Sequence, residues 1–112
     1  MAQIYHTDSH DVVAGKLAEL IRKNNAGRLV VTVNTPAGDR PDIILRDESA
    51  GKDVAAIEVE TADSLGSENS GARWKKFAAQ YPALQAIVPK GTAARAHRIA
   101  KKLGIKVRLQ EY

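Results

Sequence analysis

Three acidic side chains stand at the ends of two strand-like stretches in residues 40–60, RPDIILRDESAGKDVAAIEVE. Asp42 opens the first stretch, and Glu58 and Glu60 close the second. In a regular antiparallel hairpin the numbers of paired residues have a constant sum, and a turn centred near residue 50 makes that sum about 100. The spacing therefore predicts that Asp42 faces Glu58 across the hairpin, with Cβ atoms about 5 Å apart. Glu60 is predicted to share their face, because side chains alternate along a strand.

Carboxylates this close repel one another and raise one another's pKa. A hard divalent cation such as Mg²⁺ or Mn²⁺ offsets the repulsion and takes oxygen ligands. The stretch around Glu58 is apolar enough for a core strand, which favours a buried cluster. The alternative interpretation is that these acids sit at strand ends and point into water.

The chain around the acids predicts an alternation of helices and strands. Apolar residues recur at helical spacing in some segments, and β-branched runs bounded by turn residues predict strands in others. The predicted elements are a helix over 8–27, strands over 28–34, 40–46 and 54–60, a helix over 72–82, a strand over 84–89, a helix over 91–104 and a strand over 105–110. We expect a mixed α/β (α+β) fold of order α-β-β-β-α-β-α-β, a central mixed sheet flanked by helices. Its last two strands are added in parallel by right-handed crossovers.

Length and composition limit the organisation and the class of protein. A chain of 112 residues suits one domain with one core, spanning residues 1–112. The absence of cysteine excludes a disulfide framework, a thiolate zinc site and a cysteine nucleophile. The chain begins without a basic-then-apolar signal pattern, and no apolar run approaches the roughly 18 residues of a membrane span. We therefore expect a cytoplasmic protein with no membrane partner.

The charges are divided unevenly along the chain. Residues 39–72 hold nine acidic and three basic side chains, whereas residues 73–110 hold ten basic side chains and no acidic one. An acidic centre followed by a basic third indicates a site for cations and a surface for a polyanion. The alternative is that the basic residues only solvate two helix faces.

The segments RPDIIL and IEVE, on the second and third predicted strands of this element order, resemble the PD-(D/E)xK nuclease superfamily, whose members share the restriction-endonuclease-like fold. Pro41 and Asp42 match the first half of the motif, and Glu58 matches its second acid. The resemblance covers nearly the whole chain in element order, although the motif itself is short. It implies a small stand-alone nuclease that hydrolyses DNA phosphodiester bonds with Mg²⁺ or Mn²⁺.

The resemblance also implies a set of metal ligands. Asp42 and Glu58 would hold the ion together with the backbone carbonyl of Val59. Members of the family often carry a further acid on the first helix, and Glu19 is the acid available in the body of that helix.

Glu60 departs from the motif, because it occupies the position at which the family usually has lysine. Some restriction enzymes of the family also end the motif in glutamate, so the departure does not exclude catalysis. Glu60 could itself accept a proton from water, or Lys75 or Lys76 could reach in from the following helix, with Arg73 behind them. A third alternative is an inactive site.

The basic helices are expected to contact DNA phosphates, and a homodimer would let two sites face two strands, as in junction-resolving relatives. The expected contacts are Arg73, Lys75, Lys76, Lys90, Arg95, Arg98, Lys101 and Lys102. One alternative function is a non-catalytic module that binds nucleic acid or a protein partner and retains the nuclease fold. Another is a regulatory protein whose acidic patch binds a basic partner.

Overall fold

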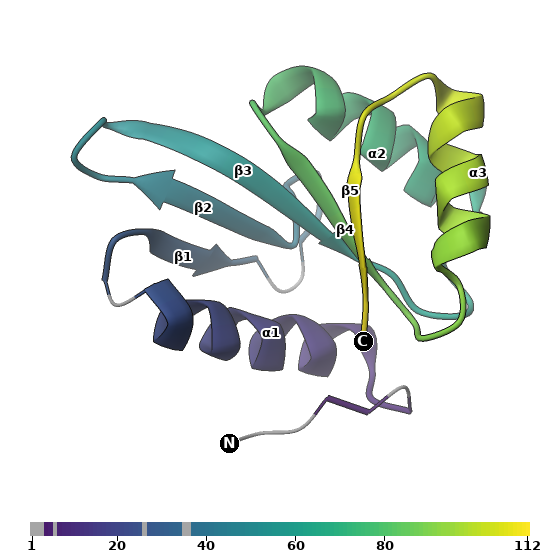
Figure 1. The fold of residues 1–112 in the computed structure, drawn as a ribbon, viewed down its shortest axis with the longest axis horizontal. Helices are drawn as coiled ribbons and strands as arrows, with labels where there is room; N and C mark the ends of the chain where they lie inside the picture. The colour runs from purple at the N-terminus through teal and green to yellow at the C-terminus, as the bar shows by residue number, and fades with distance from the viewer. Residues whose placement is uncertain (1–3, 6, 26, 35–36) are drawn as a thin grey trace.

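The computed structural model describes residues 4–5, 7–25, 27–34 and 37–112. Within these residues the fold is mixed α+β, with one five-stranded mixed sheet and three helices (Figure 1). The elements are α1 (His10–Asn25), β1 (Val30–Val33), β2 (Ile43–Asp47), β3 (Lys52–Val59), α2 (Glu68–Gln80), β4 (Leu84–Val88), α3 (Ala93–Leu103) and β5 (Arg108–Glu111). The predicted order of elements and the mixed sheet flanked by helices are confirmed.

The strands lie in the order β1-β2-β3-β4-β5. The first three strands pair antiparallel, and β4 and β5 are added in parallel. Ile43 pairs with Ile57, which is the predicted register at the end of the hairpin that carries Asp42. A bulge between Leu45 and Arg46 shifts the register toward the hairpin tip, and the sequence pattern did not predict it.

Each face of the sheet is covered by helices. Figure 1 shows α1 on one side and α2 and α3 on the other. Ile43 and Ile57 pack in the cluster that includes Ala18 of α1, whereas Ala56 packs in the cluster that includes Trp74 of α2. Because neighbouring side chains of a strand point to opposite faces, Glu58 must face α2 when Ile57 faces α1.

Local signals fix the ends of α2, the helix that covers the acidic cluster. Ser67 is its N-cap, and the Ser67 hydroxyl accepts a hydrogen bond from the Ser70 N–H at 3.1 Å. The helix ends before Pro82, as predicted, since a residue that precedes proline is disfavoured in the helical conformation. Trp74 and Phe77 are each 1% exposed and anchor α2 on the sheet.

A search of the described helices for one that is long and apolar enough to cross a membrane finds none.

Candidate functional site

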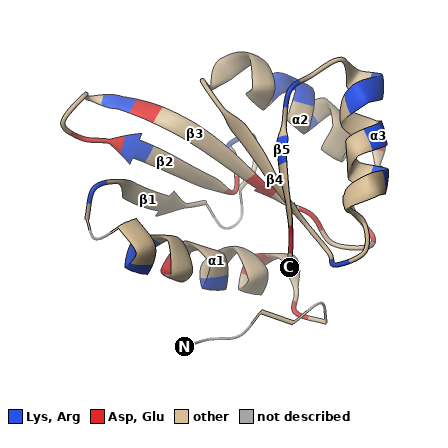
Figure 2. Ribbon diagram, in the orientation of Figure 1, with Lys and Arg blue, Asp and Glu red and all other residues tan. Residues whose placement is uncertain are grey.

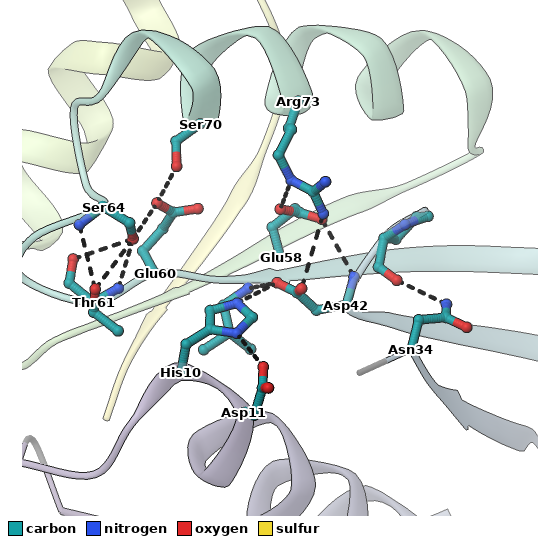
Figure 3. A network of polar contacts seen from close by, with 12 residues as sticks. His10, Asp11, Asn34, Asp42, Glu58, Glu60, Thr61, Ser64, Ser70 and Arg73 are labelled. Carbon is teal, nitrogen blue, oxygen red and sulfur yellow. Dashed lines mark hydrogen bonds and ion pairs between the residues drawn. The ribbon is translucent and has the colours of Figure 1, made fainter. Parts of the chain in front are cut away.

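A polar pocket of about 220 Å³ lies where β3 ends, between the first turns of α1 and α2 (Figure 3). Asp42, Glu58 and Glu60 all line it, and each is only 1% exposed. The prediction that the three acids gather on one face of the hairpin is confirmed, and the alternative of acids ending in water is wrong. Burying a charged group is costly unless it is paired and hydrogen-bonded, so the partners of these acids define the site.

Asp42 is tied to the neighbouring strand through both its side chain and its backbone. Its Oδ2 accepts a hydrogen bond from the Val59 N–H at 2.8 Å. Its own N–H donates to Glu58 Oε1 at 3.3 Å. The two residues predicted to face each other are therefore joined across the hairpin by hydrogen bonds as well as by register.

His10, the first residue of α1, supplies a positive charge to Asp42. Its Nε2 lies 3.0 Å from Asp42 Oδ2, and its Nδ1 lies 2.9 Å from Asp11 Oδ1. The hydrogen bond to Asp42 raises the pKa of His10 to about 9, against the opposing effect of burial. Both ring nitrogens therefore act as donors to carboxylates. Sequence reasoning missed His10, because no spacing or periodicity connects it with a residue 32 positions away.

Arg73 lies in the pocket beside Glu58. Its Nε donates to Glu58 Oε2 and its Nη2 to Glu58 Oε1, each at 3.0 Å, while Nη2 lies 3.8 Å from Asp42 Oδ1. The same guanidinium donates to the backbone carbonyls of Gly38 and Arg40. Arg73 thus links helix α2, strand β3 and the segment that leads into β2.

A basic residue from the following helix does reach the acids, but it is Arg73 rather than Lys75 or Lys76. Lys76 is exposed and donates to the Asp39 carbonyl at 3.3 Å, and Lys75 lines a separate cavity near the other end of α2. Helical spacing contains the signal that would have identified the residue. Arg73 is four positions before the buried Phe77, on the inward arc of α2, whereas the two lysines lie outside that arc.

The positive charges in the pocket do not fully offset the negative ones. Burial raises the pKa of Glu58 to about 7, although the hydrogen bonds from Arg73 oppose this, and the charges of Asp42 and Glu60 act in the same direction as burial. Among the described residues of the pocket, three carboxylates share two cationic groups, Arg73 and His10. These residues are therefore one positive charge short when every acid is ionised, and a further cation would be stabilised there.

Glu60 is held by the protein and points away from Asp42. Its Oε1 accepts hydrogen bonds from the hydroxyls of Ser64 at 2.9 Å and Ser70 at 2.7 Å (Figure 3). Its Oε2 accepts one from Trp74 Nε1 at 3.0 Å. These three bonds fasten the end of β3 to the loop after it and to α2. Glu60, where the resemblance led us to expect a departure from lysine, is therefore bonded to α2, the helix that also carries Arg73.

Glu19 is not brought to the pocket. Its side chain is 69% exposed and pairs at 3.0 Å with Arg22, three residues further along α1. The helix contributes its first residue, His10, in place of the acid expected from its body. The expected ligand Val59 does line the pocket, and its N–H is turned to Asp42.

Whether Mg²⁺ or Mn²⁺ fits these residues depends on the carboxylate oxygens that can still accept a ligand bond. A carboxylate oxygen can accept about two hydrogen bonds. Within the described ranges, Asp42 Oδ1 accepts none, because the Arg73 guanidinium is 3.8 Å away, and Glu58 Oε2 accepts one. Mg²⁺ is usually bound through one or two carboxylates completed by waters and substrate phosphates. The open oxygens of Asp42 and Glu58 fit that requirement.

Other metals fit the same residues less well. Among the residues that the structure describes, no group of three His, Cys, Asp or Glu side chains could hold a metal ion by itself. A structural zinc site takes about four protein ligands, so the donor set here suits a hard cation that keeps much of its water.

The other basic residues expected to contact nucleic acid lie on the surface. Figure 2 shows basic positions along α3 and on α2. The exposed residues are Lys75, Lys76, Lys90, Arg95, Arg98, Lys101 and Lys102. Arg95 also donates to the Leu65 carbonyl at 3.1 Å, which ties α3 to the loop before α2. Arg73 is the member of the expected set that the fold withdraws from the surface.

Comparison of the chain with models of known protein families, with curated proteins and with solved structures finds no match.

Proposed function

We propose that the chain is a small metal-dependent nuclease of the PD-(D/E)xK type, with the restriction-endonuclease-like topology, that hydrolyses DNA phosphodiester bonds. The observation that carries the proposal is the buried pair Asp42 and Glu58. The two residues face each other from neighbouring strands and, among the described residues, keep carboxylate oxygens open beside a pocket with fewer cations than carboxylates. Among divalent metal ions, Mg²⁺ and Mn²⁺ match these oxygen donors best.

Each residue of the pocket has a defined part in this proposal. Asp42 and Glu58 would hold the ion, which would supply Lewis acidity and lower the pKa of a bound water. His10 and the Val59 N–H orient the Asp42 carboxylate. Arg73 orients Glu58 through two parallel hydrogen bonds and brings the positive charge that the motif lysine carries in relatives.

The exposed cations of α2 and α3 would bind the remaining phosphates of the substrate. Such contacts position a duplex without reading its sequence, and the affinity they give falls steeply with salt. A homodimer would present two such pockets to the two strands of a duplex.

The direct test is cleavage of supercoiled plasmid and of a branched duplex with Mg²⁺ or Mn²⁺. Asp42→Asn and Glu58→Gln keep the size of each side chain and should abolish cleavage. Asp63→Asn is the matched control, because Asp63 is exposed and lies in the loop beside the pocket. Cleavage that persists in both pocket variants would contradict the assignment.

One observation favours a second function, that of a nucleic-acid-binding module without catalysis. The Arg73 guanidinium makes four hydrogen bonds, two of them to Glu58. An arginine held this firmly can replace the metal as the partner of the acids. In that case the protein binds DNA in EDTA with a strong salt dependence, cuts no substrate with any metal, and binds as well after Asp42→Asn.

A further inference from the structure

We call the pocket lined by Asp42, Glu58 and Glu60 the carboxylate pocket. A second cavity, of about 740 Å³, lies at the far end of α2 from it. Ser70, in the first turn of α2, lines the pocket, and Tyr81, just after its last turn, lines the cavity. The cavity is bounded by the ends of α2 and α3 and by the segments that lead into β4 and β5. The two sites have no lining residue in common within the described ranges.

One wall of the cavity is apolar and contains an aromatic ring. Leu84, Leu103 and Val107 contribute aliphatic surface beside Tyr81. The Tyr81 ring packs edge-on against Phe77, with centroids 6.2 Å apart and planes at 71°, which holds it in place. The Tyr81 hydroxyl has no hydrogen-bond partner among the described residues. This wall offers a flat surface with a polar tip, which suits a heteroaromatic ring.

The rim of the cavity is cationic. Lys75, Lys106 and Arg108 are exposed and line it, and the described lining contains no acidic residue. None of these three side chains forms an ion pair or hydrogen bond with another described residue. Burial raises the pKa of Tyr81, and the negative charge of Asp53 acts in the same direction. The Asp53 carboxylate is itself paired with Arg46 at 3.3 Å. The rim therefore keeps three unneutralised cations beside an apolar wall.

We propose that this cavity binds one nucleotide unit of an unpaired nucleic-acid strand. The base would lie on Tyr81 and the aliphatic wall, and Lys75, Lys106 and Arg108 would hold the phosphates on either side of it. The cavity falls within the range of about 300–1,000 Å³ that is usual for sites of small ligands. Aromatic stacking together with a cationic groove is the general means of binding single strands.

A strand is the occupant that the charges favour. The basic face of α3 continues from the cavity, because Lys101 and Lys102 are exposed in the turn just before the lining residues Leu103 and Gly104. A polymer with regularly spaced phosphates can contact the rim and this face together, whereas a free mononucleotide can contact the rim alone. The site does not depend on the carboxylate pocket and goes beyond the proposed nuclease activity.

The test is a titration of the full chain followed by amide NMR, in EDTA and on the Asp42→Asn variant so that no cleavage interferes. The probes are a short oligothymidylate, the same sequence annealed to its complement, thymidine monophosphate, thymidine and inorganic phosphate. We expect saturable shifts at Gly104, Lys106 and Arg108 with the single-stranded oligomer. At these three amides, the affinity for each of the other four probes should be at least about tenfold lower, which corresponds to one lost contact of moderate strength.

Two variants of the cavity test the roles of its rim and its wall. The double variant Lys106→Gln, Arg108→Gln should weaken binding of the oligomer about tenfold or more, since it removes two phosphate contacts. Tyr81→Leu should weaken it by a similar factor at any salt concentration, because stacking is not ionic. Lys23→Gln, an exposed cation of α1, is the matched control and should leave binding unchanged.

Several outcomes would overturn the proposal. They are shifts confined to Glu58 and Ser70 or to the outer face of α3, shifts of the cavity amides that give equal affinity for the free mononucleotide or for the duplex, and a double variant that binds as well as Lys23→Gln. Should Tyr81→Leu fail to fold, the double variant Lys106→Gln, Arg108→Gln decides whether the cavity binds the strand. Tyr81→Phe, which keeps the ring and removes the hydroxyl, should then bind the oligomer. A protein that binds the oligomer here but never cuts DNA would refute the nuclease and leave this site standing.

Discussion

The carboxylate pocket and the cavity at the far end of α2 use charged residues in opposite ways. In the pocket, Arg73 and His10 are committed to the protein's own acids, and Asp42 and Glu58 are each 1% exposed. Around the cavity, the cations are exposed and have no partner among the described residues. The difference lies in burial and not in composition. It predicts that charges in the pocket govern stability, and that charges around the cavity govern binding.

The free energies at stake differ by severalfold between the two regions. Removing one partner of a buried ion pair costs about 3–5 kcal/mol, because a charge is left buried and unpaired. An exposed ion pair is worth about 0–1 kcal/mol.

Arg73→Met should cause the largest loss of stability. It leaves Glu58 without its cation, and we expect the free energy of unfolding to fall by about 3–5 kcal/mol near neutral pH, as measured by urea denaturation. Arg73→Lys should lose less, because lysine restores the charge but not the two parallel hydrogen bonds. Lys75→Met, on the exposed face of the same helix, is the control and should change stability by about 0.5 kcal/mol or less. An Arg73→Met variant as stable as this control would show that the pocket does not depend on the ion pair.

The free energy of unfolding should depend on pH because the pKa of Glu58 is raised in the folded protein. Burial raises the pKa of Glu58 from 4.5 to about 7, so the folded protein binds this proton more tightly than the unfolded chain. The stabilisation is present below the unfolded pKa and is lost as pH rises through about 7, a decrease on the order of 3 kcal/mol. His10, whose pKa is raised from 6.5 to about 9, adds a second decrease between those two values.

Glu58→Gln separates the two titrations. The variant should lose the decrease on the acidic side of neutrality and keep the one due to His10, as followed by thermal unfolding in metal-free buffers across the pH range. Stability of the unmodified protein that rises from pH 4.5 to about 7 would contradict a raised Glu58 pKa.

Exposed cations of α3 should give the smallest effect on stability. The double variant Lys101→Gln, Lys102→Gln should change the free energy of unfolding by about 0.5 kcal/mol or less per residue. If both side chains contact phosphates, the slope of log affinity for DNA against log salt should flatten by roughly two. Binding measured by fluorescence anisotropy over a salt series gives this slope. An unchanged slope would place the nucleic-acid contacts elsewhere.

The fold and half of the site follow from local sequence patterns. Alternation of apolar residues predicts the order of elements, and the position of the turn predicts that Ile43 pairs with Ile57, with Asp42 and Glu58 beside them. The bulge at Leu45 changes the register only toward the tip, so it leaves the acidic end intact. These features depend on neighbours in sequence, which is why the sequence alone predicts them.

The partners of the acids depend on contacts across the fold, and the sequence alone does not predict all of them. His10 meets Asp42 only because the sheet places the start of α1 at the end of β3. Arg73, and not a lysine, reaches Glu58 because the inward arc of α2 is set by Trp74 and Phe77. The first contact could not be predicted without the fold, whereas the second could have been predicted from helical spacing.

A crystal soaked in Mn²⁺ and examined by anomalous scattering shows whether Asp42 and Glu58 bind a divalent ion. We predict one anomalous peak within coordination distance of Asp42 Oδ1 and Glu58 Oε2, and no such peak in Glu58→Gln crystals soaked alongside. Density that shows Arg73 still bound to both Glu58 oxygens, with no peak between the two acids, would contradict the claim and favour a module that holds nucleic acid without cutting it.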